Sequence, residues 1–254
     1  MTHIVIPGDT LSAIAHANGI TPEELLDANP QFKADPDIIH PGDVVTIPGD
    51  EPETPAQPVA APSAFADRLA GVAQRLHEEF SSVNEADPEL CAAIKKWTKG
   101  IGATFVSCTS NNHPWSAVFV SWCVKEAGAT AAEFKFSTQH SVFVHKAIKD
   151  ADNGAGLFHG RRISDHAPNI GDIIHHNRGG ATFTFDDARQ SSNFPSHSVI
   201  VVDTREDELG RFALCIGGNE SDSIRTTKVR LTPRGLVRPR GRNPFICVIQ
   251  TLKP

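Results

Sequence analysis

Apolar and polar positions change pattern along the chain in a way that separates a short first unit from a longer second one. In residues 1–49, short apolar runs at 3–6 and within 38–48 predict two strands. Between them, apolar positions at helical spacing predict two helices, the first beginning near Leu11 and the second containing Leu25. The predicted order in this unit is therefore strand, helix, helix, strand.

A linker is predicted between the two units, at residues 50–63. It is rich in proline, alanine and acidic residues and has no apolar periodicity, which is typical of a semi-extended segment. Charge also changes here: residues 1–62 hold ten acidic side chains and one basic, a net charge of −9, whereas the remainder holds 23 basic and 20 acidic, a net charge of +3. We therefore expect two independent domains, at 1–49 and 64–254.

The second domain begins with helical patterns and continues with strand patterns. An amphipathic stripe predicts a helix at 65–83, a proline near the start predicts another at 87–102, and a third is expected between Pro114 and Gly128. Apolar runs then predict strands within 168–178, 196–203, 212–221 and 244–252. This order indicates an α+β fold in which helices pack on an antiparallel sheet.

Composition and charge exclude several classes of protein. The chain has 254 residues, of which 39% are hydrophobic, so a soluble globular protein with a sizeable core is expected. No apolar run approaches the roughly 20 residues of a membrane span. Seven basic residues within 225–242 form either a solvated strand and loop or a patch for an anionic partner. Nucleic acid is not expected as a partner, because no recognition motif accompanies these basic residues. A membrane is not expected either, because no apolar run is long enough to span one.

The cysteines are odd in number and include no CxxC pair. This pattern favours free thiols packed in the core of a protein in a reducing compartment over a disulfide framework or a zinc ribbon. The positions are Cys91, Cys108, Cys123, Cys215 and Cys247.

Metal binding by histidine is also considered. His175 and His176 are neighbours on a predicted strand, so their side chains point to opposite faces and cannot both bind one ion. His140 could contribute to a cleft or simply pack or cap a helix. No motif typical of zinc enzymes is present, and we expect no metal and no cofactor.

The stretch PWSAVFVSWCVKEAG, at 114–128, carries the main candidate for catalysis. Ser116 lies in the first turn of the predicted helix, where free backbone N–H groups and the positive end of the helix dipole favour an anion. The same position suits an ordinary serine near a helix start. His197 begins one predicted strand and Asn219 ends the next, so an antiparallel hairpin would place them side by side. These residues predict a Ser-His-Asn site.

Two stretches of the first unit, VIPGDTLSAIAHANGITPEELLDANP and IHPGDVVTIP, resemble a LysM module over its whole length. The resemblance implies binding of N-acetylglucosamine-containing glycans, in peptidoglycan or chitin, in a shallow groove between two loops. The residues carried over to this groove are Gly8, Asp9, Thr10, Leu11, Asn29, Pro30, Ile39 and His40.

Five blocks of the second domain resemble a bacterial family of domains of unknown function that is itself similar to the NlpC-like and CHAP-like peptidoglycan hydrolases. The blocks are PWSAVFVSWCVKEAG, FSTQHSVFV, NIGDIIHHNR, SHSVIVVD and IGGNESDSI. The resemblance implies a papain-like domain in which Ser116 replaces the nucleophilic cysteine, His197 is the base and Asn219 orients it. Trp115, His140 and His176 are candidate cleft residues.

The resulting functional hypothesis is a wall hydrolase that cleaves an amide bond of the peptidoglycan peptide, as an endopeptidase or an N-acetylmuramoyl-L-alanine amidase, with LysM as its targeting module. The alternative is a catalytically inactive peptidoglycan- or chitin-binding protein or a phage structural adaptor. The first residues lack the features of a secretory signal, so we expect synthesis in a bacterial cytoplasm and action on the cell wall or in the periplasm after export by another route or lysis. The routes considered are phage lysis, as an endolysin, and a secretion machine, as an antibacterial effector; a holding state in the cytoplasm is the third alternative. Secretion machinery or an immunity protein would then be partners.

Overall fold

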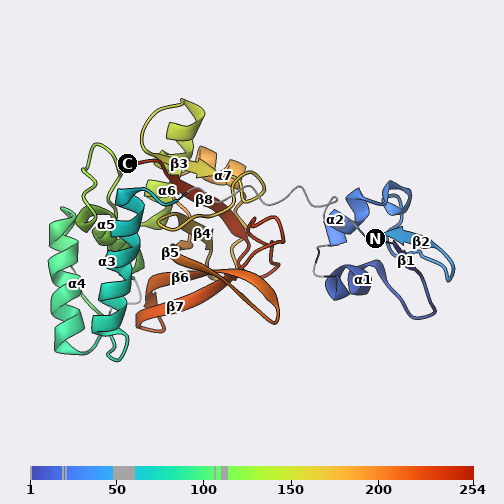
Figure 1. The fold of residues 1–254 in the computed structure, drawn as a ribbon, viewed down its shortest axis with the longest axis horizontal. Coiled ribbons are helices and arrows are strands. Elements are labelled where there is room, and N and C mark those ends of the chain that lie inside the picture. Colours follow the sequence, from blue (N-terminus) through green and yellow to red (C-terminus); the bar gives the residue numbers. More distant parts are fainter. Residues whose placement is uncertain (1, 19, 21, 48–60, 106, 110–113) are drawn as a thin grey trace. The chain divides into compact units, whose positions relative to one another are not determined.

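The computed structural model describes residues 2–18, 20, 22–47, 61–105, 107–109 and 114–254 (Figure 1). The chain divides into two compact units, Met1–Gln57 and Pro58–Pro254. Most of the predicted linker, at 50–60, lies outside the described residues. No helix within the described ranges is both long enough and apolar enough to cross a membrane.

The first unit has the predicted order of strand, helix, helix and strand. Its two short strands pair antiparallel, with Ile4 opposite Val44. The helices cover a small core in which Leu25 and Val45 are fully buried. The elements are β1 (Thr2–Ile4), α1 (Leu11–Ala17), α2 (Pro22–Asp27), the 3-10 helix η1 (Pro30–Phe32) and β2 (Val44–Thr46). The prediction for this unit is confirmed.

The second unit has the predicted α+β fold. Its helices are α3 (Ala64–Phe80), α4 (Pro88–Gly100), α5 (Ser116–Glu126), α6 (His140–Asp152) and α7 (Phe185–Gln190). Its strands are β3 (Phe158–Arg161), β4 (Ile173–Asn177), β5 (Ser196–Asp207), β6 (Gly210–Glu220), β7 (Ser223–Arg230) and β8 (Phe245–Thr251). The α3, α4 and α5 helices and the β4, β5, β6 and β8 strands were expected, whereas α7 and β3 were not.

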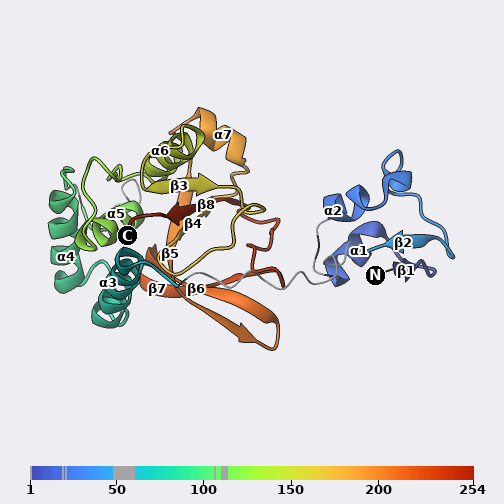
Figure 2. The same ribbon diagram turned by 45° about the horizontal axis from the view of Figure 1, so that its top comes forward.

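The strands form, within the described residues, a six-stranded antiparallel sheet in the order β3-β8-β4-β5-β6-β7. Helices α3, α5 and α6 contact the sheet, and both views show α4 on the outer side of α3 and α5 (Figures 1 and 2). The main core lies between these helices and the sheet, where Ile200 and Val202 of β5 are buried. The alternate residues Val199 and Val201 belong to a second, smaller core on the other face.

The two ends of the described second unit lie together. Ser63 accepts a hydrogen bond from the backbone N–H of Ala66, which caps α3, and its Oγ donates to the carbonyl of Lys253 at 2.6 Å. Ser63 therefore ties the start of the first helix of this unit to the segment that follows its last strand.

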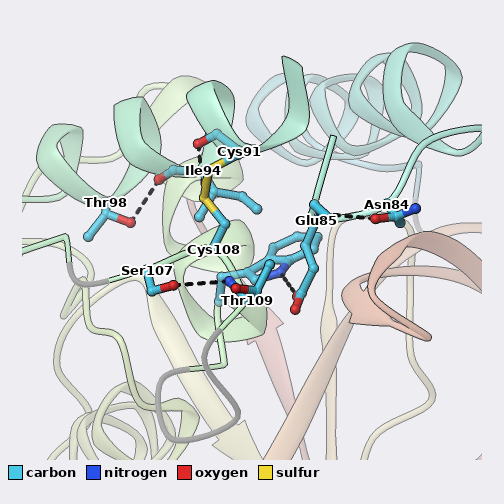
Figure 3. Close-up of a disulfide and its surroundings, with 10 residues drawn as sticks. Asn84, Glu85, Cys91, Ile94, Thr98, Ser107, Cys108 and Thr109 are labelled. Atoms are coloured by element: carbon cyan, nitrogen blue, oxygen red, sulfur yellow. Dashed lines mark hydrogen bonds between the residues drawn. A yellow bond between two sulfur atoms is a disulfide. The ribbon is translucent and has the colours of Figure 1, made fainter. Parts of the chain in front are cut away.

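A disulfide joins Cys91 to Cys108, which corrects the prediction of free thiols at these two positions (Figure 3). Cys91 lies in α4, and the chain returns over this helix so that Cys108, 17 residues later, has its Cα only 5.4 Å away. An odd number of cysteines excludes complete pairing but does not exclude a single pair. The remaining cysteines, Cys123, Cys215 and Cys247, are free and buried, as predicted.

Candidate functional site

Ser116 is the first residue of α5 and is almost fully buried, with 1% of its surface exposed. The first N–H groups of a helix have no partner within it, so the turn that begins at Ser116 has backbone donors free of helical hydrogen bonds. The start of α5 packs directly on β6 because Gly218 has no side chain. A Cβ at Gly218 would lie 2.5 Å from Cβ of Phe119 and 2.8 Å from the Trp115 ring.

His140 is the direct partner of Ser116. It is the first residue of α6, and its Nε2 lies 2.7 Å from the Ser116 Oγ. Burial lowers the pKa of His140 well below its ordinary value, and the neighbouring His197 and His175 lower it further. A neutral His140 can accept the Ser116 proton at Nε2, and its Nδ1 then carries a hydrogen. This Nδ1 is buried without a hydrogen-bond partner among the described residues.

His197 contacts His140, and the hydrogen bond to Ser116 that was predicted for His197 is made by His140. The ring centroid of His197 is 5.1 Å from that of His140 and 5.3 Å from that of His176, which faces it across β4 and β5. The Nε2 of His197 is bound to the carboxylate of Glu220 at 2.8 Å. This hydrogen bond lowers the pKa of Glu220, so the carboxylate is ionised at neutral pH. The chain of contacts is therefore Ser116, His140, His197 and Glu220.

Glu220 takes the place predicted for Asn219 because the hairpin of β6 and β7 has a bulge. The pairing shifts between Gly218 and Glu220, and Asn219 adopts a left-handed backbone with a φ of 57°. One extra residue changes which side chains share a face, so Glu220 lies over Gly217. A Cβ at Gly217 would come within 3.1 Å of the Glu220 Oε1. Asn219 thus has a backbone role here, and the predicted contact to His197 is made by its neighbour.

His175 and His176 have different surroundings, as their alternation on β4 predicts. His175 is fully buried, and its Nδ1 lies 2.8 Å from the Ser198 Oγ. Its Nε2 has no hydrogen-bond partner among the described residues. Burial lowers the pKa of His175 well below its ordinary value and that of His176 to about 4. In the described ranges, no three histidine, cysteine or acidic side chains converge in a group that could hold a metal ion.

A pocket of about 550 Å³ opens over Ser116 and His140. Trp115 lines this pocket, in agreement with its prediction as a cleft residue. Its indole N–H donates a hydrogen bond to Glu85 at 2.7 Å. His176 and His197 are not among the lining residues. Most of the wall consists of hydroxyl, amide and apolar groups: Ile94, Thr98, Thr104, Phe105, Ser107, Pro114, Val118, Thr138, Gln139, Ser141, Asn193, Phe194, Pro195 and Ser196. Arg178 also lines the pocket.

The residues predicted to bind glycan differ in exposure. Gly8, Thr10, Pro30 and His40 are exposed, and Asp9 and Ile39 are partly exposed. Leu11 belongs to the core of the first unit.

Asn29 is fully buried and is a structural residue in this fold. Its side chain donates to the carbonyls of Leu25 and Thr46 and accepts from the Thr46 N–H. It thereby holds the end of α2 against β2 and has little capacity left for a ligand.

Two functional candidates were not identified from the sequence. Glu220 follows Asn219 directly, and only the bulge decides which of the two faces His197. Arg178 lies two residues beyond His176, in the turn after β4, and nothing in the local pattern indicates that it lines a pocket.

Comparison with known protein families assigns both units. Residues 3–48 match the LysM domain, which indicates binding of peptidoglycan or chitin. No curated protein matches the sequence. Residues 67–245 match the family described as an uncharacterized protein conserved in bacteria (DUF2272). Since this match covers well over half of the sequence, the chain belongs to the DUF2272 family and carries a LysM domain at its N-terminal end.

Proposed function

We propose that this protein is a peptidoglycan hydrolase that cleaves an amide bond of the wall peptide, as an endopeptidase or an N-acetylmuramoyl-L-alanine amidase. The observation that carries the proposal is the hydrogen bond of 2.7 Å between Ser116 and His140 at the start of a helix, within a pocket of about 550 Å³. The LysM domain supports the substrate, since it binds peptidoglycan or chitin. The resemblance to NlpC-like and CHAP-like hydrolases supports the reaction.

In the first step, the Ser116 Oγ attacks the carbonyl carbon of the amide while His140 Nε2 accepts its proton. Negative charge develops on the carbonyl oxygen and is stabilised by the free N–H groups in the first turn of α5. This charge also favours the protonated form of His140. The His140 proton then passes to the amide nitrogen, the C–N bond breaks, and the amine leaves.

In the second step, a water molecule replaces the amine. His140 accepts a proton from the water, and the resulting hydroxide attacks the acyl carbon of the Ser116 ester. The C–O bond to Ser116 breaks, the serine oxygen regains a proton from His140, and a carboxylic acid is released.

His197 and Glu220 support this proton transfer from behind His140. Glu220 binds Nε2 of His197, and the His197 ring contacts the His140 ring at a centroid distance of 5.1 Å. The ionised carboxylate places a negative charge two contacts from His140, where it favours a positive imidazolium. His197 and Glu220 are positioning residues in this scheme.

The second candidate is a wall-binding protein without catalysis. It is favoured by the surroundings of the buried His140 Nδ1. In a serine triad, the corresponding N–H donates a hydrogen bond to a third residue, and the described residues provide no such acceptor for His140. In that case, the Ser116 and His140 pair is a buried structural hydrogen bond.

Digestion of purified sacculi, with the products analysed by mass spectrometry, separates the two candidates. Wild-type protein is expected to release fragments with new amine termini, and Ser116→Ala to lose at least about 10³-fold in rate with the fold retained. Ser116→Cys is expected to keep measurable turnover. Ser164→Ala removes an exposed hydroxyl outside the pocket and is the control. Binding of sacculi by the wild type without release of fragments would favour the second candidate, a wall-binding protein without catalysis.

The predicted targeting role is tested with residues 61–254, which contain the whole described second unit. This fragment is expected to digest soluble peptides like the full chain but to bind sacculi less well, because it lacks LysM. Equal binding by both proteins would contradict targeting.

The Cys91–Cys108 disulfide supports a site of action in an oxidising compartment, such as the bacterial periplasm. Delivery by phage lysis or by a secretion machine is the proposed route, and an immunity protein is the partner expected for the secreted case.

A further inference from the structure

Among the described residues that line the pocket over Ser116, a single side chain, that of Arg178, is permanently charged. Arg178 carries a guanidinium, whereas His140 is neutral because burial lowers its pKa, and the other described lining residues have no charged side chain. A positive charge at the wall of a mostly uncharged pocket attracts an anionic group of a ligand.

The backbone before Arg178 is fixed on both sides. Asn177 is fully buried, its side chain donates to the carbonyls of Phe183 and Pro244, and it accepts from the Phe183 N–H. Its own N–H donates to Pro244. These hydrogen bonds hold the turn after β4 in place. The position of the Arg178 backbone is therefore determined by its buried neighbour Asn177.

The guanidinium of Arg178 has its donors available. Its side chain is exposed, and no acceptor for it is found among the described residues. Other arginines of this unit are paired with carboxylates, for example Arg189 with Asp152 and Arg230 with Asp207. Arg178 nevertheless acts on the site, because its charge contributes to lowering the pKa of both His140 and Glu220.

We propose that the pocket binds an acidic peptide and that Arg178 holds a free carboxylate of this peptide next to the amide bond attacked by Ser116. The inference rests on the proposed hydrolase function and names its substrate class. A planar guanidinium matches a carboxylate with two parallel hydrogen bonds. A peptide carboxylate is favoured over a phosphate because the LysM domain directs the protein to peptidoglycan, whose stem peptides carry free carboxylates.

The test is a binding experiment that needs no turnover. Full-length Ser116→Ala protein is titrated by calorimetry with N-acetyl-alanyl-glutamate, with the same dipeptide carrying amides in place of both carboxylates, and with inorganic phosphate. The acidic dipeptide is expected to bind at least about tenfold more tightly than the diamide, since a charge-assisted pair is lost in the latter. Phosphate alone is expected to bind weakly.

Variants at Arg178 are made in the same background. Arg178→Gln is expected to abolish the preference for the acidic dipeptide, and Arg178→Lys to keep part of it as a point charge. Arg234→Gln removes the same charge from an exposed position outside the pocket and is expected to change nothing.

Equal binding of both dipeptides, binding of neither, tighter binding of phosphate than of the acidic dipeptide, or an unchanged preference in Arg178→Gln would overturn the inference. The proposed hydrolase function would be contradicted by a different result, namely that Ser116→Ala protein digests sacculi as fast as the wild type. The two failures are therefore distinguishable.

Discussion

Glu220 binds His197 through a hydrogen bond of 2.8 Å, and it does so because the chain bulges at the residue before it. Glu220→Gln keeps the shape of the side chain and removes its charge. It is expected to slow digestion of sacculi about 10- to 100-fold, which is the usual effect of a lost charge-assisted hydrogen bond.

The matched control for Glu220 is Asn219→Gly. Glycine adopts the left-handed backbone of Asn219 without strain, so the bulge is retained and only the amide is removed. Activity close to that of the wild type is expected. A large loss in Asn219→Gly with little effect of Glu220→Gln would restore the orienting role that the sequence assigned to Asn219.

Gly218 is expected to be intolerant of any side chain. In Gly218→Ala, the new Cβ would lie 2.5 Å from Cβ of Phe119, and α5 would have to move away from β6. Overpacking of this kind costs about 1–3 kcal/mol of unfolding free energy, so thermal unfolding should begin at a lower temperature.

Gly71→Ala is the control for this substitution, because a Cβ there meets nothing within 4 Å and the residue lies in α3. It is expected to leave the unfolding temperature unchanged or to raise it. If Gly218→Ala unfolded like the wild type, the close packing of α5 on the sheet would be refuted.

The Cys91–Cys108 disulfide is expected to stabilise the second unit and the wall of the pocket. Its sequence separation of 17 residues corresponds to a contribution of about 3 kcal/mol to the unfolding free energy. Ser107, next to Cys108, lines the pocket, so the loss should also weaken binding there. Chemical denaturation of Cys108→Ser, with and without a reductant, measures the effect.

In this experiment, a reductant should destabilise the wild type but not Cys108→Ser. The free thiols Cys123, Cys215 and Cys247 are buried, and burial raises their pKa, so they should react little with a thiol reagent. An unfolding free energy of the wild type that does not respond to the reductant would contradict the prediction.

Stability is expected to fall as the pH decreases below about 6.5, the ordinary pKa of histidine. Burial lowers the pKa of His176 to about 4 and places those of His140 and His175 well below the ordinary value. Between these values, the unfolded chain binds protons that the folded chain does not, so acid favours unfolding. Each imidazole that stays neutral contributes a slope of up to about 1.4 kcal/mol per pH unit.

Urea denaturation at about pH 7, 6 and 5 measures this slope. His176→Gln removes one of the three imidazoles and should flatten it, whereas His40→Gln, in the first unit, should not. A constant unfolding free energy over this range would show that the cluster is protonated in the folded state.

The sequence predicted the elements better than the contacts between them. The stripe of α3 and the apolar runs of β4, β5, β6 and β8 are strong periodic signals, and they identified the α+β fold. The short strand β3 and helix α7 have only 4 and 6 residues, too few to establish a period.

The site was predicted only in part, because its contacts depend on tertiary structure. Ser116 was found from its place at a helix start, but its partner His140 is the first residue of another helix, 24 positions later, and only the tertiary fold brings the two helix starts together. Glu220 depends on one bulged residue, and the Cys91–Cys108 pair on the return of the chain over α4. Local pattern carries none of this information.

The bond between Ser63 and Lys253 has a consequence for engineering. The start of the first helix of the second unit lies beside the end of its last strand. A short peptide could therefore join these two ends and make the second unit circular. The circle could then be opened at the hairpin between β5 and β6, where Leu209 is 74% exposed. Such a circular permutant would keep the site intact while carrying a wall-binding domain at a new place on the surface.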